Sequence, residues 1–159
     1  MQTQKKVNKP QRYQRLIKQI EELLQKSPAP VSAMSTIAAV LFHKLPYFSW
    51  CGFYYLHNNE LIVGPYQGPV ACQVLAQHKG VCWAAIDSNR TVIVPDVEKF
   101  PGHIACDSRT KSEIVVPIAN EKGEVIAVLD VDSRQLNSFD EDDKNGLEAI
   151  IKLIEPLHI

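Results

Sequence analysis

Residues 112–133 read SEIVVPIANEKGEVIAVLDVDS, and this stretch decides the fold. Two runs rich in β-branched residues, Glu113–Ile118 and Glu124–Asp132, flank the turn sequence Ala119–Gly123. Side chains alternate between the two faces of a strand, so this pattern predicts a β-hairpin. Gly123 can take the positive φ that such a turn needs. The chain is therefore expected to contain an antiparallel sheet.

Acidic residues interrupt this apolar hairpin at three positions. Asp130 and Asp132 share one strand face, and Glu113 lies on the neighbouring strand. Carboxylates are unusual in a sheet that should bury valines, although exposed charges on an edge strand are a common alternative. If the three carboxylates crowd together in a partly desolvated site, at least one pKa should rise enough to hold a proton at neutral pH.

A second hairpin is expected nearer the N-terminus. Trp50, Gly52 and Tyr54 fall on one face of a strand, and this strand is followed by a turn at 57–60 and a new strand at 61–63. Because glycine has no side chain, Gly52 is expected to leave open space between two aromatic rings. Aromatic residues at period two belong to the core in most sheets, and here they also fit the wall of a pocket.

The middle of the chain has weaker patterns. The segment 64–80 contains a short apolar run, Val70–Leu75, that fits a strand or a helix, and we expect a strand. Thr91–Val94 is a clearer strand because Pro95 closes it. Residues 96–111 have neither helical nor alternating periodicity, which predicts a loop or a lid, and long loops in compact domains are often functional.

Helices are expected near both ends of the chain. Apolar residues recur at intervals of three and four over residues 13–24, and a second, shorter helix should run from about residue 32 to residue 45. Ser138–Glu141 has the pattern of a capping box before a helix whose apolar side spans 147–157. The predicted fold is α+β, with a central antiparallel sheet packed with N- and C-terminal helices.

The composition indicates one cytoplasmic domain. A length of 159 residues suits a single domain over 1–159, with 1–10 as a flexible N-terminal arm. The net charge of -1 leaves no basic face for nucleic acid. The chain has no signal-peptide pattern, and no stretch approaches the roughly 20 apolar residues that cross a bilayer. We therefore expect neither a nucleic-acid nor a membrane partner.

The four cysteines are Cys51, Cys72, Cys82 and Cys106. They are too few and too widely spaced for a secreted disulfide framework, so each should be either a buried, inert thiol or a reactive one. Cys51 faces away from the Trp50 side of its strand and is expected to be buried. Cys106 lies in a polar loop between His103 and Asp107, where an apolar filler has no purpose. We expect Cys106 to be reactive.

Five motifs occur in order along the chain. They are Gly80–Trp83, Val92–Val97, Phe100–Ser108, Ser112–Pro117 and Val128–Ser133. Together with the aromatic strand from Trp50 they resemble the free methionine-R-sulfoxide reductase family, whose domain is of the GAF type. This resemblance covers most of the chain. It implies a GAF-like fold and thiol-dependent reduction of free L-methionine (R)-S-oxide, a defence against oxidative stress, without a metal, flavin or nicotinamide cofactor.

The resemblance also implies roles for the cysteines. Sulfoxide reduction needs a thiolate that attacks sulfur and a second thiol that removes the resulting sulfenic acid. By likeness to the family, Cys106 is the nucleophile and Cys72 the resolving thiol. Cys82 either resolves as a second thiol or acts first. The Cys72–Cys106 disulfide would then be reduced by thioredoxin, and the family likeness suggests a homodimer.

The same likeness gives the pocket its residues. Glu113, Asp130 and Asp132 match the family's pocket carboxylates, with Glu113 among the catalytic candidates. One of them would protonate the sulfoxide oxygen, while the others bind the α-ammonium of a free amino acid. A peptide-bound methionine, whose nitrogen is an uncharged amide, would then be refused. Trp50 and Tyr54 would hold the methyl and sulfur of the substrate against their rings.

Two other classes of function fit parts of the sequence. A non-catalytic GAF module would sense a ligand or a redox change without turnover, which a thiol-dependent assay would reveal. A zinc protein would use Cys72, Cys82, His103 and Cys106, which are suitable ligand types but lack the close Cys-x-x-Cys spacing. Metal analysis separates this alternative from the others.

Overall fold

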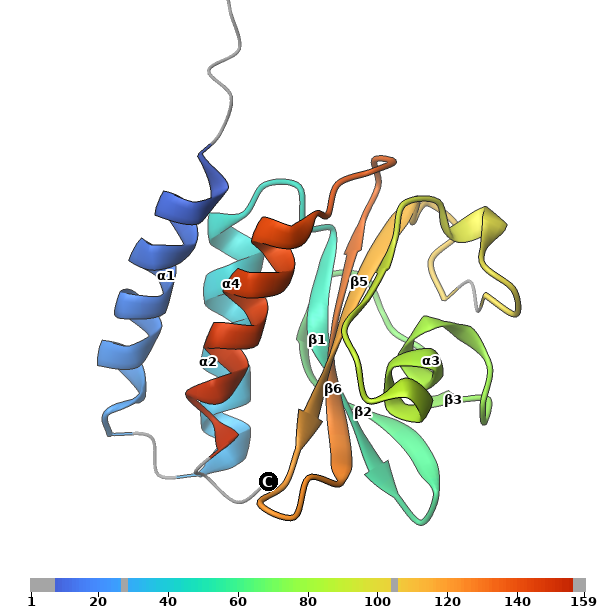
Figure 1. Cartoon of the computed structure of the whole chain (residues 1–159), viewed down its shortest axis with the longest axis horizontal. Coiled ribbons are helices and arrows are strands. Elements are labelled where there is room, and N and C mark those ends of the chain that lie inside the picture. Colours follow the sequence, from blue (N-terminus) through green and yellow to red (C-terminus); the bar gives the residue numbers. More distant parts are fainter. Residues whose placement is uncertain (1–7, 27–28, 104–105, 156–159) are drawn as a thin grey trace, which may run out of the picture.

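A six-stranded antiparallel sheet forms the central layer of the molecule (Figure 1). The computed structural model describes residues 8–26, 29–103 and 106–155. The strands are β1 (Trp50–His57), β2 (Glu60–Gln67), β3 (Val74–Leu75), β4 (Val92–Val94), β5 (Ser112–Ala119) and β6 (Val125–Ser133). Their order across the sheet is β3-β2-β1-β6-β5-β4. The two predicted hairpins are therefore β1–β2 and β5–β6, and β1 joins them by pairing with β6.

Helices from both ends of the chain cover one face of this sheet, two of them against the strands and the third outside those two, and one helix covers the other face (Figure 1). Helices α1 (Lys9–Leu24), α2 (Pro30–Lys44) and α4 (Glu141–Lys152) pack together on the first face. Helix α3 (Gly80–Ser88) and the short 3₁₀ helix η1 (Val97–Lys99) lie over the second. The predicted α+β class is confirmed. The expected helical position Leu157 lies outside the described residues.

The alternation along β1 assigns its side chains to two separate cores. Cys51 and Phe53 are fully buried beneath the three helices, whereas Trp50 and Tyr54 are buried with α3 on the opposite face. Burial of a large apolar side chain contributes roughly 1.5–3 kcal/mol, so both faces resist a one-residue slip of register. The sheet thereby holds its second face, where the acidic residues point, in a fixed position.

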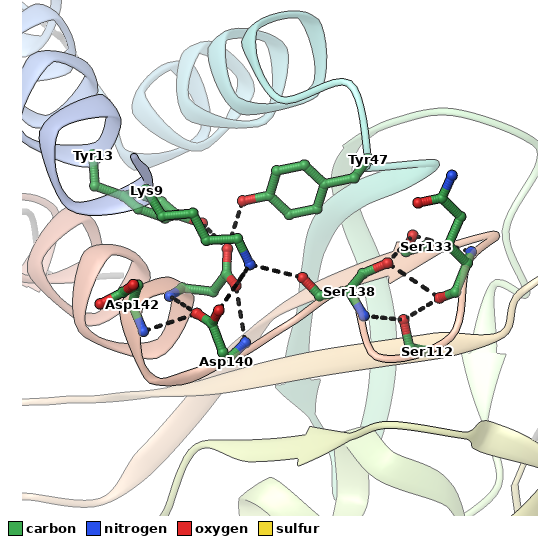
Figure 2. A network of polar contacts seen from close by, with 10 residues as sticks. Lys9, Tyr13, Tyr47, Ser112, Ser133, Ser138, Asp140 and Asp142 are labelled. Carbon is green, nitrogen blue, oxygen red and sulfur yellow. Dashed lines mark hydrogen bonds and ion pairs between the residues drawn. The ribbon is translucent and has the colours of Figure 1, made fainter. Parts of the chain in front are cut away.

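A buried polar network fastens α1 to the start of α4 (Figure 2). Asp143 is fully buried, and its carboxylate accepts hydrogen bonds from the hydroxyls of Tyr13 (2.8 Å) and Tyr47 (2.5 Å). Lys9 Nζ lies 2.6 Å from the same carboxylate. Helix α1 starts at Lys9, so the last two residues of the expected flexible arm are helical, while residues 1–7 lie outside the described part.

Three local predictions need correction. The capping box of α4 is formed by Asp140 and Asp143, because Asp140 accepts from the backbone N–H of Asp143 and Asp143 accepts from that of Asp140, so Ser138 is not the N-cap. Within Val70–Leu75 only the last two residues are a strand. Helix α3 had not been predicted. In the described part of the chain no helix is long and apolar enough to cross a membrane.

Candidate active site

A pocket opens on the α3 side of the sheet, where β1, β5 and β6 form its floor. The space between its lining residues is about 570 Å³ when the open solvent at its mouth is included. Most of the residues singled out from the sequence line it together, namely Trp50, Tyr54, Cys82, Cys106, Glu113, Asp130 and Asp132. Residues from five separate segments of the chain therefore meet at one site.

The three carboxylates form an acidic floor. In the β5–β6 register Glu113 is opposite Asp132 and Val115 is opposite Asp130, so the acids lie on neighbouring positions of one face. Glu113 and Asp130 are each only 6% exposed, and Asp132 is half-buried. The alternative of exposed edge-strand charges is wrong, because β5 and β6 are interior strands of the sheet.

Burial and mutual repulsion make these carboxyl groups weak acids. Burial raises the pKa of Glu113 well above its ordinary value, and the charges of Asp130 and Asp132 raise it further. Burial also raises the pKa of Asp130 to about 6. The pKa of Asp132 is raised by burial and by the charge of Asp130. Because a desolvated carboxylate without a counter-charge is costly, the cluster retains protons near neutral pH.

Two cysteines form a disulfide at the mouth of this pocket. Cys72 and Cys106 are bonded, with 5.6 Å between their Cα atoms, which confirms the pairing expected by resemblance. Cys106 is exposed and lies in the predicted 96–111 loop, while Cys72 is half-buried after β2. The bond joins two segments that are 34 residues apart. The alternative zinc set is not assembled, because two of its four proposed ligands are bonded to each other.

The two remaining cysteines lie in different environments. Cys51 is fully buried on the helical face of the sheet, and burial raises its pKa, so it is the inert thiol that its strand position predicted. Cys82, in the first turn of α3, is also buried but points into the pocket. Its Sγ and one oxygen each of Glu113 and Asp130 lie within 4.8 Å of one another. Burial, followed by the charge of Asp130, raises the pKa of Cys82 well above the ordinary value.

An aromatic wall lies beside the acidic floor, because Trp50 is the register partner of Asp132 on the neighbouring strand. The ring of Trp50 stacks on that of Tyr54, with 5.8 Å between centroids, and on that of Tyr66, with 5.2 Å. The indole N–H of Trp50 donates to the carbonyl of Pro69 at 3.0 Å, and the Tyr54 hydroxyl donates to the carbonyl of Cys72 at 3.4 Å. The wall therefore also supports the segment that carries Cys72.

The expected open space at Gly52 does not exist. A Cβ placed there would lie 2.2 Å from Cβ of Tyr66 and 2.7 Å from the Trp50 ring. Glycine is required because the Trp50 ring and the Cα and Cβ of Tyr66 lie against the backbone at this point. Tyr66 was missed from the sequence, and the signal for it was its pairing with Gly52 across the first hairpin.

The loop between η1 and β5 is held by local bonds. Asp107 accepts hydrogen bonds from the backbone N–H of Arg109 (3.0 Å) and from its guanidinium (2.9 Å), and these bonds lower the pKa of Asp107. Burial lowers the pKa of His103, so this side chain is neutral at pH 7 and adds no positive charge beside Cys106.

Lys79, which the sequence patterns did not single out, also lines the pocket.

Comparison with known proteins agrees with this geometry. A family model described as the GAF domain matches residues 30–155. The GAF domain-containing protein A of Dictyostelium discoideum is 46% identical over 151 residues, covering 94% of each chain. The free methionine-R-sulfoxide reductase of Saccharomyces cerevisiae is 41% identical, and the match covers 93% of this chain and 86% of that protein.

Solved structures give the same picture. The free methionine-R-sulfoxide reductase of Neisseria meningitidis, in complex with its substrate, superimposes with a TM-score of 0.90 and 38% identity over 94% of this chain and 90% of that chain. The fRMsr of Staphylococcus aureus in its reduced form has a TM-score of 0.88 and 43% identity, covering 99% of each chain. With the pocket, the cysteine pair and near full-length similarity in agreement, the chain belongs to the GAF domain family and, within it, to the free methionine-R-sulfoxide reductases.

Proposed function

We propose that this protein is an oxidoreductase that reduces free L-methionine (R)-S-oxide to methionine with its own cysteine thiols. One observation carries the proposal: three clustered carboxyl groups line the same pocket as Cys106, which is paired with Cys72. The relatives named for this reaction, one of them solved with its substrate, support it. The preference for the R configuration rests on those relatives.

The chemistry begins with the Cys72–Cys106 pair in its dithiol form. The Cys106 thiolate attacks the sulfoxide sulfur and supplies two electrons, while the oxygen takes a proton from the pocket and passes to Cys106 as a sulfenic acid. Methionine leaves. The Cys72 thiol then attacks the sulfenic sulfur, which forms the disulfide and releases water. In balance, one sulfoxide and two thiols give one thioether, one disulfide and one water.

Glu113 is our candidate for the proton donor. It is buried beside two other carboxyl groups, and its raised pKa keeps a proton available at neutral pH. A protonated carboxyl group adjacent to the sulfoxide can donate to the oxygen as its negative charge develops. Such a proton transfer contributes about 10²–10⁴-fold to a rate.

The other acidic groups suit the substrate's α-ammonium. Asp130 and Asp132 lie on the same strand face as neighbours of Glu113, and an ionised carboxylate pairs strongly with an ammonium in a buried site. Lys79, at the pocket edge, suits the α-carboxylate. A peptide-bound methionine has neither terminal charge and would leave buried charges unpaired, so the pocket should refuse it.

Regeneration requires an external dithiol. The Cys72–Cys106 bond lies at the exposed pocket mouth, where a thioredoxin could attack it by thiol–disulfide exchange. We place the reaction in the cytoplasm, because a thiol enzyme with few cysteines suits a reducing compartment. A homodimer is the proposed assembly.

Turnover is the decisive measurement. Purified reduced protein with dithiothreitol should release methionine from the free R-sulfoxide and not from the free S-sulfoxide or a peptide-bound R-sulfoxide, as followed by chromatography. If no methionine appears from any of the three while the thiols are reduced, the protein is a ligand-sensing or redox-sensing GAF module instead, with the cysteine pair as its switch.

A further inference from the structure

A thiol and two carboxyl groups converge at the bottom of the pocket. Sγ of Cys82 and one oxygen each of Glu113 and Asp130 all lie within 4.8 Å of one another, and all three residues are buried. They come from α3, β5 and β6, so each is fixed by an element that is itself packed in the core. In the proposed reaction cycle the Cys72–Cys106 pair supplies both electrons, which leaves the Cys82 thiol without a required step.

One oxygen in this cluster is left without a partner. Asp130 is only 6% exposed, and its Oδ1 is buried and makes no hydrogen bond to any residue that the structure describes. Buried carboxylate oxygens are nearly always hydrogen-bonded or bound to a cation, because leaving one bare costs the full desolvation penalty. An oxygen atom without a hydrogen bond, close to a thiol and a second carboxyl group, is suited to bind a cation.

We infer that Cys82, Glu113 and Asp130 form a binding site for a divalent transition metal ion of the Zn²⁺ class. Zn²⁺ accepts thiolate and carboxylate ligands at about 2.0–2.3 Å, which sets neighbouring ligand atoms at roughly 3.5 Å in a tetrahedron. The present separations are at most 4.8 Å, so they exceed that value by about 1.3 Å at most. The thiolate selects Zn²⁺ over Mg²⁺ and Ca²⁺, which prefer oxygen ligands.

A metal ion at this place excludes the substrate. It would neutralise the acidic floor and take the two carboxyl groups that the proposed mechanism assigns to the sulfoxide oxygen and the α-ammonium. Zn²⁺ should therefore inhibit turnover reversibly and in competition with methionine sulfoxide, and a chelator should restore the rate. This consequence rests on the proposed function, whereas metal binding itself does not.

The oxidised full-length protein allows a clean test. With Cys72 and Cys106 locked in their disulfide, Cys51 and Cys82 are the two free thiols of the chain. Titration with Co²⁺ should give a thiolate-to-cobalt charge-transfer absorption that saturates at one ion per chain and disappears when Zn²⁺ is added. Cys82→Ala should abolish the absorption, while Cys51→Ala, an equal truncation of a buried thiol on the other face, should retain it.

A second variant covers the case in which Cys82→Ala fails to fold. Asp130→Asn, checked by circular dichroism, should weaken Co²⁺ binding at least tenfold. Absence of the absorption from the folded wild-type protein, or an undiminished absorption in folded Cys82→Ala, overturns the metal site. Turnover measured with a chelator present is independent of these results, so failure of the enzyme proposal would be seen separately.

Discussion

Two buried aspartates on opposite sides of the sheet behave in opposite ways. Asp143, on the helical side, is fully buried, but its carboxylate binds Lys9 and two tyrosine hydroxyls and accepts a backbone N–H. Asp130, on the α3 side, is almost as deeply buried, yet its Oδ1 has no hydrogen-bond partner among the described residues, and burial raises its pKa to about 6. The depth of burial is nearly equal. The difference is that Asp143 has an ion pair with Lys9, whereas Asp130 has no ion pair in the described part of the chain and one unpaired oxygen.

The difference separates structure from chemistry. A buried carboxylate with a full set of donors stabilises the fold, and Asp143 does so by joining α1 to α4. A buried carboxylate without a charged partner destabilises the fold, and in the proposed function Asp130 gains that partner when the substrate's ammonium group binds. The helical side of the sheet should therefore respond to mutation through stability, and the pocket side through activity.

The largest expected effect is on the pocket side. Cys106→Ser should lower turnover by at least about 10³-fold because serine cannot supply the electrons, while thermal stability of the reduced protein stays unchanged. Cys72→Ser should release about one methionine per chain and then slow, since the sulfenic acid is no longer resolved. Cys51→Ser is the matched control, with full turnover expected. Methionine production at full turnover by Cys106→Ser contradicts the assignment of the nucleophile.

Glu113→Gln should be next in size. Loss of the proton donor should lower kcat by about 10²–10⁴-fold. In the wild type, a raised Glu113 pKa predicts that kcat falls as pH rises through that pKa, because the donor loses its proton, and the glutamine variant should lack this alkaline limb. The profile is measured from about pH 5 to about pH 9 with saturating substrate. If Glu113→Gln keeps both the wild-type kcat and the alkaline limb of the pH profile, the proton donor is another group.

On the helical side, Asp143→Ala should unfold the protein more easily without harming turnover. The change leaves the Tyr13 and Tyr47 hydroxyls and the Lys9 ammonium without their acceptor, at an expected cost of about 3–5 kcal/mol. Urea denaturation measures this cost. Asp142→Ala, an exposed neighbour in the same turn, is the control and should change stability by less than about 1 kcal/mol. A large loss of kcat in folded Asp143→Ala would break the division between the two sides.

Sequence patterns predicted the helical side well because it obeys simple periodicities. The stripe over residues 13–24 and the two hairpins were confirmed, and the alternation in β1 assigned Cys51 and Trp50 to the correct faces. The donors around Asp143 were not foreseen, since Lys9 and Tyr13 are more than 125 residues away in the chain. Periodicity over a few residues gives no information on contacts between residues that are far apart in the chain.

The pocket side was harder to predict, for physical reasons. Helix α3 has the sequence GVCWAAIDS, which is apolar on most sides and begins without a side-chain cap, so it has no amphipathic stripe and no start signal. Tyr66 was missed because a register shift between Gly52 and Tyr54 separates it from simple alternation. The carboxylates were found because acids among valines violate the strand pattern, as functional residues often do.

The smallest expected effect tests the contrast between Asp130 and Asp143 directly. Asp130→Asn should stabilise the fold. The folded-state pKa of Asp130 lies at about 6 against an ordinary 3.8, so ionisation favours the unfolded chain and stability is lost as pH rises from about 4 to about 6. A shift of this size corresponds to roughly 3 kcal/mol, and imperfect pairing of the new amide should leave a gain of about 1–3 kcal/mol at pH 7. Urea denaturation at about pH 4 and about pH 7 measures it, with the exposed Glu22→Gln as control. A gain that grows with pH means that Asp130 opposes folding where Asp143 supports it, whereas a loss at neutral pH would mean that Asp130 already has donors and that the two aspartates do the same structural work.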